Sequence, residues 1–345
     1  MYDIAIIGLG PAGATLARLL DKKYKVIAID KKSKKASKCC GGLLSPDAQK
    51  ILAQFDLCLP KDILADPQIF SVKTIDLDNN MERFYQRFYV NMDRLKFDGF
   101  LASLIPDNIT ICRGSICTGI VQTENKFAIK IKAKGKERII ESGMVIGADG
   151  ASSIVRGTFY KKFKIQKYAA IQEWYKDKST SPFYSCIFDR EITNSYCWTI
   201  SKDNSFIIGG AFPVKDCNNK FELLKQKVLE QGISFKKLIK REGCFVFLNQ
   251  NPFSTCTGRS GAYLIGEAAG MISPSSLEGI SYSMKSAKIL AGIINKNSNH
   301  IGRRYFFGAM GIRFNLMLKI FKRPFMYNSF LRWLVMKSGI KAIRK

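Results

Sequence analysis

Residues 2–30 read YDIAIIGLGPAGATLARLLDKKYKVIAID. An apolar run, a glycine-rich turn, a helical pattern and a second apolar run that ends in an acid follow one another, which is the order of a βαβ unit. The three glycines have the spacing GxGxxG, which allows a tight turn, close approach of a pyrophosphate and close packing of helix on strand. The residues that we expect to hold a dinucleotide are Gly8, Gly10, Pro11, Ala12, Gly13 and Asp30.

Two later segments also place small and polar residues after an apolar run. Residues 145–156 read VIGADGASSIVR, with Asp149 at the turn, and residues 262–280 read AYLIGEAAGMISPSSLEGI, with Glu267 at the turn. Three such strand ends exceed what NAD requires. They suit a longer flavin dinucleotide, whose ribityl hydroxyls can contact an acid and whose pyrimidine carbonyl can contact amides at a helix start near Gly279. We therefore predict FAD as the cofactor.

The composition is that of a globular protein without a membrane span. The chain has 345 residues, of which 46% are hydrophobic and 24% charged, enough for two lobes. Its first apolar run contains Asp3 and continues into the glycine turn, unlike a signal peptide. The ten cysteines form no CxxC pair and only one histidine accompanies them, so we expect reduced thiols, no metal site and a cytoplasmic location.

The net charge of +27 indicates an anionic partner. Residues 279–345 contain fourteen Lys or Arg and no Asp or Glu, interleaved with large apolar side chains. Two interpretations stay open: amphipathic helices that bind an anionic membrane surface on the inner face of the cell membrane, or helices that pack on the core. No helix-turn-helix, zinc-finger or RNP-like pattern supports binding to nucleic acid.

The distribution of the motifs predicts a division of the chain. Residues 66–90 and 165–255 lack cofactor motifs and carry aromatic residues in alternating patterns, so we expect a β-rich substrate domain there. The remaining parts are a discontinuous FAD-binding domain over residues 1–65, 91–164 and 256–300, and a basic amphipathic helical region over residues 301–345.

Four motifs in this order resemble the flavoproteins typified by p-hydroxybenzoate hydroxylase: GLGPAG at 8–13, YVNMDRLKFD at 89–98, GADGASSIVR at 147–156 and GEAAGMISPSSLEGI at 266–280. KCCGGLLSP at 38–46 is similar to the Cys-Gly-rich segment of the geranylgeranyl reductase family, whose members saturate C=C bonds of isoprenoid chains. Residues 196–198, YCW, resemble that family's Tyr-x-Trp motif. The resemblance implies an α/β (α+β) fold with a Rossmann-type FAD-binding domain of the p-hydroxybenzoate hydroxylase/glutathione reductase type, a β-rich substrate-binding domain and a helical C-terminus.

By position in these motifs, the resemblance implies further cofactor-binding residues: Lys31, Cys40, Gly41, Gly42, Arg94, Asp149, Gly266, Glu267, Pro274, Gly279 and Ile280. We expect an aromatic substrate wall formed by Phe183, Tyr184, Tyr196, Trp198 and Phe212. Two departures put details of both sites in question. The usual Gly-Asp has become Gly266-Glu267, and the usual Tyr-x-Trp-x-Phe-Pro reads YCWTIS.

The resemblance also implies an activity, namely reduction by FAD of a C=C bond in a hydrophobic substrate such as a polyprenyl phosphate, at the membrane surface. Cys40 is the candidate catalytic residue that positions the alkene or relays a proton, and a packing role is the alternative. The electron donor stays open between NAD(P)H and a ferredoxin-like protein. Two other functions stay open: an aromatic monooxygenase of the same fold, and a non-catalytic flavin-containing protein that binds lipid or nucleic acid.

Overall fold

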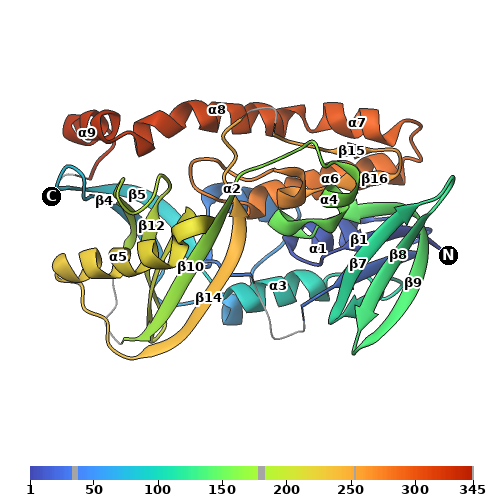
Figure 1. The fold of residues 1–345 in the computed structure, drawn as a ribbon, viewed down its shortest axis with the longest axis horizontal. Coiled ribbons are helices and arrows are strands. Elements are labelled where there is room, and N and C mark those ends of the chain that lie inside the picture. The colour runs from blue at the N-terminus through green and yellow to red at the C-terminus, as the bar shows by residue number, and fades with distance from the viewer. Residues whose placement is uncertain (33–37, 178–182, 252–253, 344–345) are drawn as a thin grey trace. The chain divides into compact units, whose positions relative to one another are not determined.

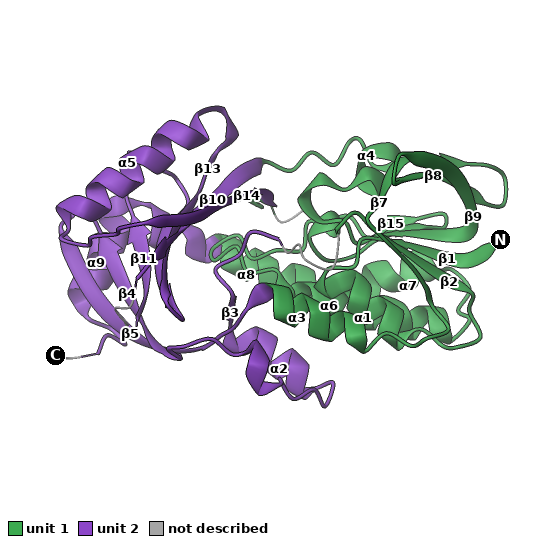
Figure 2. Ribbon diagram, turned by 90° about the horizontal axis from the view of Figure 1, so that it is seen from below, with its two compact units in different colours: residues 1–37, 95–166, 247–320 green, residues 38–94, 167–246, 321–345 purple. Residues whose placement is uncertain are grey.

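The computed structural model describes residues 1–32, 38–177, 183–251 and 254–343. The chain divides into two compact units, which Figure 2 colours separately. Unit 1 comprises residues 1–37, 95–166 and 247–320. Unit 2 comprises residues 38–94, 167–246 and 321–345.

Unit 1 is built on a sheet with the strand order β15-β16-β9-β1-β2-β6, to which β7 and β8 are added through β9 (Figure 1). Its strands are β1 (Tyr2–Ile7), β2 (Val26–Asp30), β6 (Thr110–Arg113), β7 (Ser115–Gln122), β8 (Phe127–Ala133), β9 (Lys136–Gly147), β15 (Gly258–Arg259) and β16 (Ala262–Leu264). Its helices are α1 (Pro11–Leu19), α3 (Arg94–Ser103), α4 (Ile154–Phe159), α6 (Ile280–Asn295), α7 (Ile301–Gly308) and the first part of α8 (Met310–Tyr327).

The predicted βαβ unit at the start of the chain is confirmed. β1 pairs in parallel with β2, with Ile4 opposite Val26, and in parallel with β9 on its other side. The last four residues of β1 and all of β2 are buried, as expected for parallel strands that are covered on both faces. The glycine turn therefore leaves a central strand of the sheet, the position where doubly wound folds bind ligands.

Unit 2 has a largely antiparallel sheet with the order β14-β10-β13-β12-β11-β4-β5-β3. Its strands are β3 (Leu43–Leu44), β4 (Ile69–Asp76), β5 (Met81–Asn91), β10 (Lys167–Lys176), β11 (Phe183–Phe188), β12 (Cys197–Lys202), β13 (Ser205–Pro213) and β14 (Leu238–Phe247). Its helices are α2 (Pro46–Ala53), α5 (Cys217–Glu230), α9 (Ser329–Ser338) and the end of α8.

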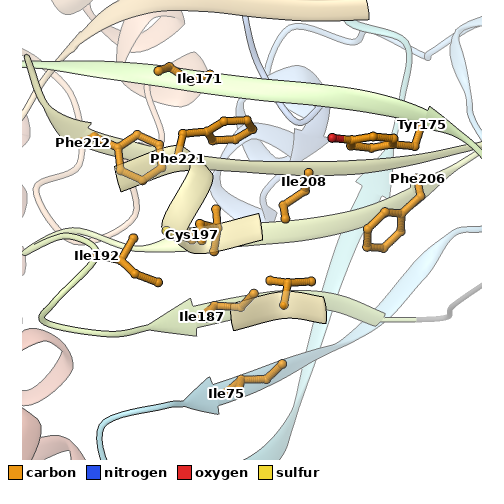
Figure 3. Close-up of a cluster of buried hydrophobic side chains, with 12 residues drawn as sticks. Ile75, Ile171, Tyr175, Ile187, Ile192, Cys197, Phe206, Ile208, Phe212 and Phe221 are labelled. Carbon is orange, nitrogen blue, oxygen red and sulfur yellow. The ribbon is translucent and has the colours of Figure 1, made fainter. Parts of the chain in front are cut away.

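One face of this sheet packs against α5 and forms the hydrophobic core of unit 2. Alternate residues of β10, β12 and β13, among them Ile171, Cys197 and Ile208, meet Phe221 and Leu224 of the helix (Figure 3). Because side chains alternate along a strand, the neighbouring residues of these strands face the other side of the sheet.

The division differs from the predicted domains most at two places, and residues 91–94 and 247–255 also fall in the other unit from the one predicted. Residues 38–65 belong to unit 2, because β3 pairs with β5 and the amide of Ala65 donates to the carbonyl of Asn91. Residues 301–345 do not form a region of their own: 301–320 belong to unit 1, where α7 packs on α6, and 321–345 belong to unit 2. Among the described residues, no helix has both the length and the apolar character needed to cross a bilayer.

Candidate functional site

Two glycines of the turn after β1 are required by the fold. Gly8 has φ of +98°, and a Cβ there would lie 2.7 Å from the carbonyl oxygen of Ala148. A Cβ at Gly13 would lie 1.9 Å from the carbonyl oxygen of Gly8. The backbone of β1, the start of α1 and the end of β9 are therefore packed too closely for any larger residue.

The glycine between them is not required by the fold. Gly10 has φ of −71° and ψ of −171°, which any residue adopts, and a Cβ there would meet no described atom within 4 Å. It is the N-cap of α1, and it makes no side-chain hydrogen bond to the first helical turn, where Pro11 stands. Open space beside a helix N-terminus suits an anionic group such as a pyrophosphate, so the geometry fits the predicted dinucleotide.

Asp30 lies at the end of β2, the position expected for the ribose contact. Its side chain is buried, Oδ1 accepts a hydrogen bond from the Lys32 amide at 3.3 Å, and Arg113 Nη1 lies 3.9 Å from Oδ2. Burial raises the pKa of this carboxyl. The hydrogen bond from the Lys32 amide and the positive charges of the Lys32 and Arg113 side chains oppose this rise. The neighbouring Lys31 is exposed.

Glu267 is buried and Asp149 is half-buried, and both carboxylates bind backbone amides. Asp149 Oδ2 accepts from the amide of Ile154 at 2.7 Å at the start of α4, and Glu267 Oε1 accepts from the amide of Phe247 at 3.0 Å. Gly266 has φ of +57°, which favours glycine. The contact between Glu267 and the ribityl chain stays a prediction. The carboxylate that would make this contact also accepts the hydrogen bond from the Phe247 amide.

Arg156 stands at the end of the VIGADGASSIVR stretch but is not among the predicted cofactor-binding residues. Its guanidinium is buried and donates to the carbonyls of Ala268 at 2.8 Å and Ala151 at 2.6 Å. It therefore joins the loop after β9 to the loop after β16. The available signal was an arginine six residues after Gly150, the last residue of the Gly-Ala-Asp-Gly turn.

The loop before α6 contains Pro274 and ends at Gly279, the N-cap, which has no side-chain hydrogen bond to the first turn that begins at Ile280. Hydrogen bonds within the loop shape it, from the amide of Ser273 to the carbonyl of Glu278 at 2.8 Å and from the amide of Leu277 to the carbonyl of Ser273 at 3.0 Å. The start of α6 thus presents amides that suit a carbonyl acceptor.

In unit 2 the predicted residues Cys40, Gly41 and Gly42, named here the CGG segment, are seated on the sheet. A Cβ at Gly41 would lie 2.5 Å from Ile200 Cδ1, and Gly42 has φ of +70°. Both glycines are therefore needed for close approach of the segment to the sheet.

Next along the chain, Ser45 caps α2 by accepting from the amide of Ala48 at 3.2 Å, with Pro46 in the first turn. Arg94 is the first residue of α3 and is half-buried.

All three carbonyls of the CGG segment accept hydrogen bonds from buried side chains. Gln172 Nε2 lies 3.3 Å from the oxygen of Cys40, and Lys202 Nζ lies 2.9 Å from that of Gly41 and 3.3 Å from that of Gly42. The sequence analysis named neither side chain. Alternation along CWTISK places Lys202 on the same face as Trp198 and Ile200, and this was the available signal.

Three of the five predicted wall residues share the face of the sheet that α5 does not cover. Tyr184 lies opposite Ile200, and the ring of Tyr196 is centred 5.7 Å from that of Trp198. The Trp198 ring lies over Gly209, since a Cβ there would be 2.6 Å from its Nε1. Tyr89, which was not predicted, extends this face with its ring 5.7 Å from that of Tyr184.

The other two predicted wall residues are corrected by the register. Phe212 is fully buried in the core beneath α5, with its ring 6.0 Å from that of Phe221 (Figure 3). Phe183 is one residue from Tyr184 and therefore points to the opposite side, where its ring lies 4.9 Å from that of Phe84. In the described parts of the chain, no group of three His, Cys, Asp or Glu side chains could hold a metal ion.

Comparison with known proteins identifies the family. No family model matches the chain. Protein CbrA of Escherichia coli O157:H7 is 45% identical over 346 residues, which cover 99% of this chain and 98% of the relative. The chain belongs to the CbrA family.

Solved structures confirm the predicted fold class for this CbrA-family chain. A geranylgeranyl bacteriochlorophyll reductase-like protein from Thermoplasma acidophilum has a TM-score of 0.81 at 20% identity, covering 97% of this chain and 90% of that one. The flavin-dependent brominase Bmp2 has a TM-score of 0.68 at 16% identity, covering 99% of each chain. At these identities the similarity shows a common fold, and the fold hosts both reductase-like and halogenating proteins.

Proposed function

We propose that this CbrA-family protein is an FAD-dependent oxidoreductase. The observation that carries the proposal is the open space at Gly10, beside an uncapped helix start, in a turn whose other two glycines the fold itself requires. Asp30 provides an acceptor for a ribose hydroxyl, and the start of α6 provides amides for a carbonyl of the isoalloxazine. The fold shared with flavin-dependent proteins supports FAD as the dinucleotide.

The reaction that fits best is reduction of a C=C bond in an isoprenoid chain. When bound, FAD in its reduced form supplies a hydride to one alkene carbon while a proton adds to the other. An isolated alkene offers little for polar groups to bind, so the protein must orient it and exclude water. The aromatic face formed by Tyr89, Tyr184, Tyr196 and Trp198 suits this task, and Cys40 stays the candidate for placing a proton or the alkene.

The test is a product analysis with purified protein that contains FAD. We expect a polyprenyl substrate, incubated without oxygen with NAD(P)H in one arm and a reduced ferredoxin in another, to gain the mass of two hydrogens. An aromatic monooxygenase is the second candidate, because the same aromatic face also suits a planar ring. It would instead add one oxygen atom and consume O₂ only when the substrate is present. Flavin binding without either product would contradict both reactions.

Membrane association of the proposed reductase is supported by α8. Met310, Phe314, Leu318, Phe321 and Phe325 follow one another at spacings of three or four residues and so lie along one side of the helix. Their side chains are between 44% and 65% exposed. The helix carries four basic and no acidic residues, so its charge complements an anionic bilayer.

Replacing both Phe321 and Phe325 by Ser is expected to weaken binding to anionic vesicles by about 100-fold or more, because the two phenylalanines together lose roughly 3–6 kcal/mol of apolar burial. Co-sedimentation with vesicles of phosphatidylglycerol and phosphatidylcholine measures the binding. The matched control replaces Val121 and Ile139 of β7 and β9, which are 64% and 69% exposed, by Ser. Equal binding by both double variants would contradict a membrane role for α8.

A further inference from the structure

Lys202, the last residue of β12, carries a buried ammonium group. Its side chain is 3% exposed, and its Nζ donates to three backbone carbonyls, those of Gly41 at 2.9 Å, Gly42 at 3.3 Å and Met92 at 2.6 Å. Within the described residues, the hydrogen-bond partners of this Nζ are all backbone carbonyls. A lysine is rarely buried unless it is paired, because removing its charge from water is costly.

The three carbonyls that Lys202 binds join two stretches of unit 2. Gly41 and Gly42 belong to the CGG segment, and Met92 follows β5. The amide of Met92 in turn donates to the carbonyl of Gly42 at 2.8 Å. A Cβ at Gly42 would lie 2.1 Å from Lys202 Nζ and 2.3 Å from the carbonyl oxygen of Met92. The ammonium group and the glycine therefore occupy one close-packed site.

The geometry at Cys40 extends this site. The amide of Gly42 lies 3.4 Å from Cys40 Sγ, and Gln172 Nε2 binds the Cys40 carbonyl and Glu242 Oε2 at 3.3 and 2.8 Å. Cys40 itself is half-buried. The carbonyl of Cys40 and those of the two residues after it are thus held by side chains from β10 and β12, which restricts the position of the thiol.

We propose that Lys202 is a positioning residue that holds the CGG segment, and with it the Cys40 thiol, on the aromatic face of the substrate-binding unit. The inference rests on the proposed function, because the position of Cys40 matters for catalysis only if the protein is the proposed reductase. Hydrogen bonds from an ammonium group to carbonyls are stronger than those from a neutral donor, so a lysine is suited to hold three backbone carbonyls in place.

Lys202 changes its protonation state within a pH range that experiments can reach. Burial lowers the pKa of Lys202 to about 8, and the neighbouring charge of Lys240 acts in the same direction. Cys40 in the segment, Asp93 after β5 and Asp203 in the turn after β12 oppose this decrease. Because the folded site favours the neutral amine, which still donates to carbonyls, the hold on the segment is expected to persist as the pH rises through this value.

The test compares Lys202→Met with Lys225→Met in the full-length protein with FAD bound. Lys225 of α5 pairs with Glu173 at 3.3 Å on the opposite side of the sheet, so its variant controls for general loosening of unit 2. We expect amide hydrogen exchange of residues 40–44 and alkylation of Cys40 to be about tenfold faster in Lys202→Met, equivalent to roughly 1.4 kcal/mol, and unchanged in Lys225→Met. Unchanged exchange and alkylation in Lys202→Met would overturn the proposal.

The wild-type protein provides a second measurement should Lys202→Met fail to fold. After correction for intrinsic rates, the protection of residues 40–44 relative to β13 is expected to increase between pH 7 and about pH 9.5, because opening of the segment returns Lys202 to water and to its usual pKa. Parallel changes in both segments would overturn the proposal. If the proposed function is wrong, the protein will show no flavin binding or no turnover. If only the positioning role of Lys202 is wrong, the protein will bind flavin and turn over substrate, and exchange in residues 40–44 will not depend on Lys202.

Folding stability gives an independent check on the buried charge. Below pH 8 Lys202 carries its proton in both states, but between about pH 8 and its usual pKa of 10.5 the unfolded chain binds a proton that the folded chain has released. The free energy of unfolding of the wild type, relative to Lys202→Met, is therefore expected to rise with pH across this window. Parallel pH dependence of the two proteins in urea titrations would contradict a buried, protonated Lys202.

Discussion

Gly10→Val is expected to abolish FAD binding while the protein still folds. A Cβ at Gly10 meets no described atom within 4 Å, and the backbone dihedral angles there suit valine, so the substitution has room in the empty turn. The same room is what a pyrophosphate needs to approach the start of α1. We expect the affinity for FAD to fall by about 100-fold or more, equivalent to roughly 2.7 kcal/mol.

Flavin absorbance of the purified protein and titration with FAD measure this loss. The apo forms of Gly10→Val and the wild type should unfold at the same temperature, while added FAD should raise the midpoint of the wild type alone. Gly292→Val is the matched control, because Gly292 also has open space at its Cβ position but lies within α6, past its first turns. Full flavin content in Gly10→Val would remove the main support for the proposed function.

Arg332→Met is expected to destabilise unit 2 by about 3–5 kcal/mol. Arg332 of α9 is 4% exposed, and its Nη2 lies 2.7 Å from Asp76 Oδ1 and 2.7 Å from Asp78 Oδ2. Asp76 is fully buried. Removing the guanidinium leaves this carboxylate without its cation in a site that excludes water, and it also detaches α9 from the end of β4.

Urea unfolding followed by tryptophan fluorescence measures the change, because Trp174, Trp198 and Trp333 all belong to unit 2. Arg190→Met is the control: Arg190 Nε lies 3.7 Å from Asp78 Oδ1, but its side chain is 82% exposed. Its loss is expected to cost no more than about 1 kcal/mol. Similar effects of the two substitutions would show that contact with Asp78, rather than burial of the pair, governs stability.

The unit that binds the dinucleotide could be predicted well from local patterns. The apolar runs of β1 and β2, the glycine spacing and Asp30 all lie within 30 residues, and the structure places them as expected. The aromatic wall could be predicted only in part. Tyr184 and Trp198 share a face, but Phe212 packs beneath α5, because its side depends on the pairing of β13 with β12 rather than on its own aromatic character.

The Cys-Gly-Gly sequence shows most clearly how far local sequence patterns can predict a site. The motif could be recognised at residues 40–42, yet its binding partners Gln172 and Lys202 lie more than 130 positions further along the chain. The elements whose cause is local could be predicted from the residues alone, namely the βαβ start and the glycines that permit close approach. The face that each strand residue occupies and the carbonyls that a buried lysine binds depend on the three-dimensional fold, because strand register and burial arise from pairing between distant segments.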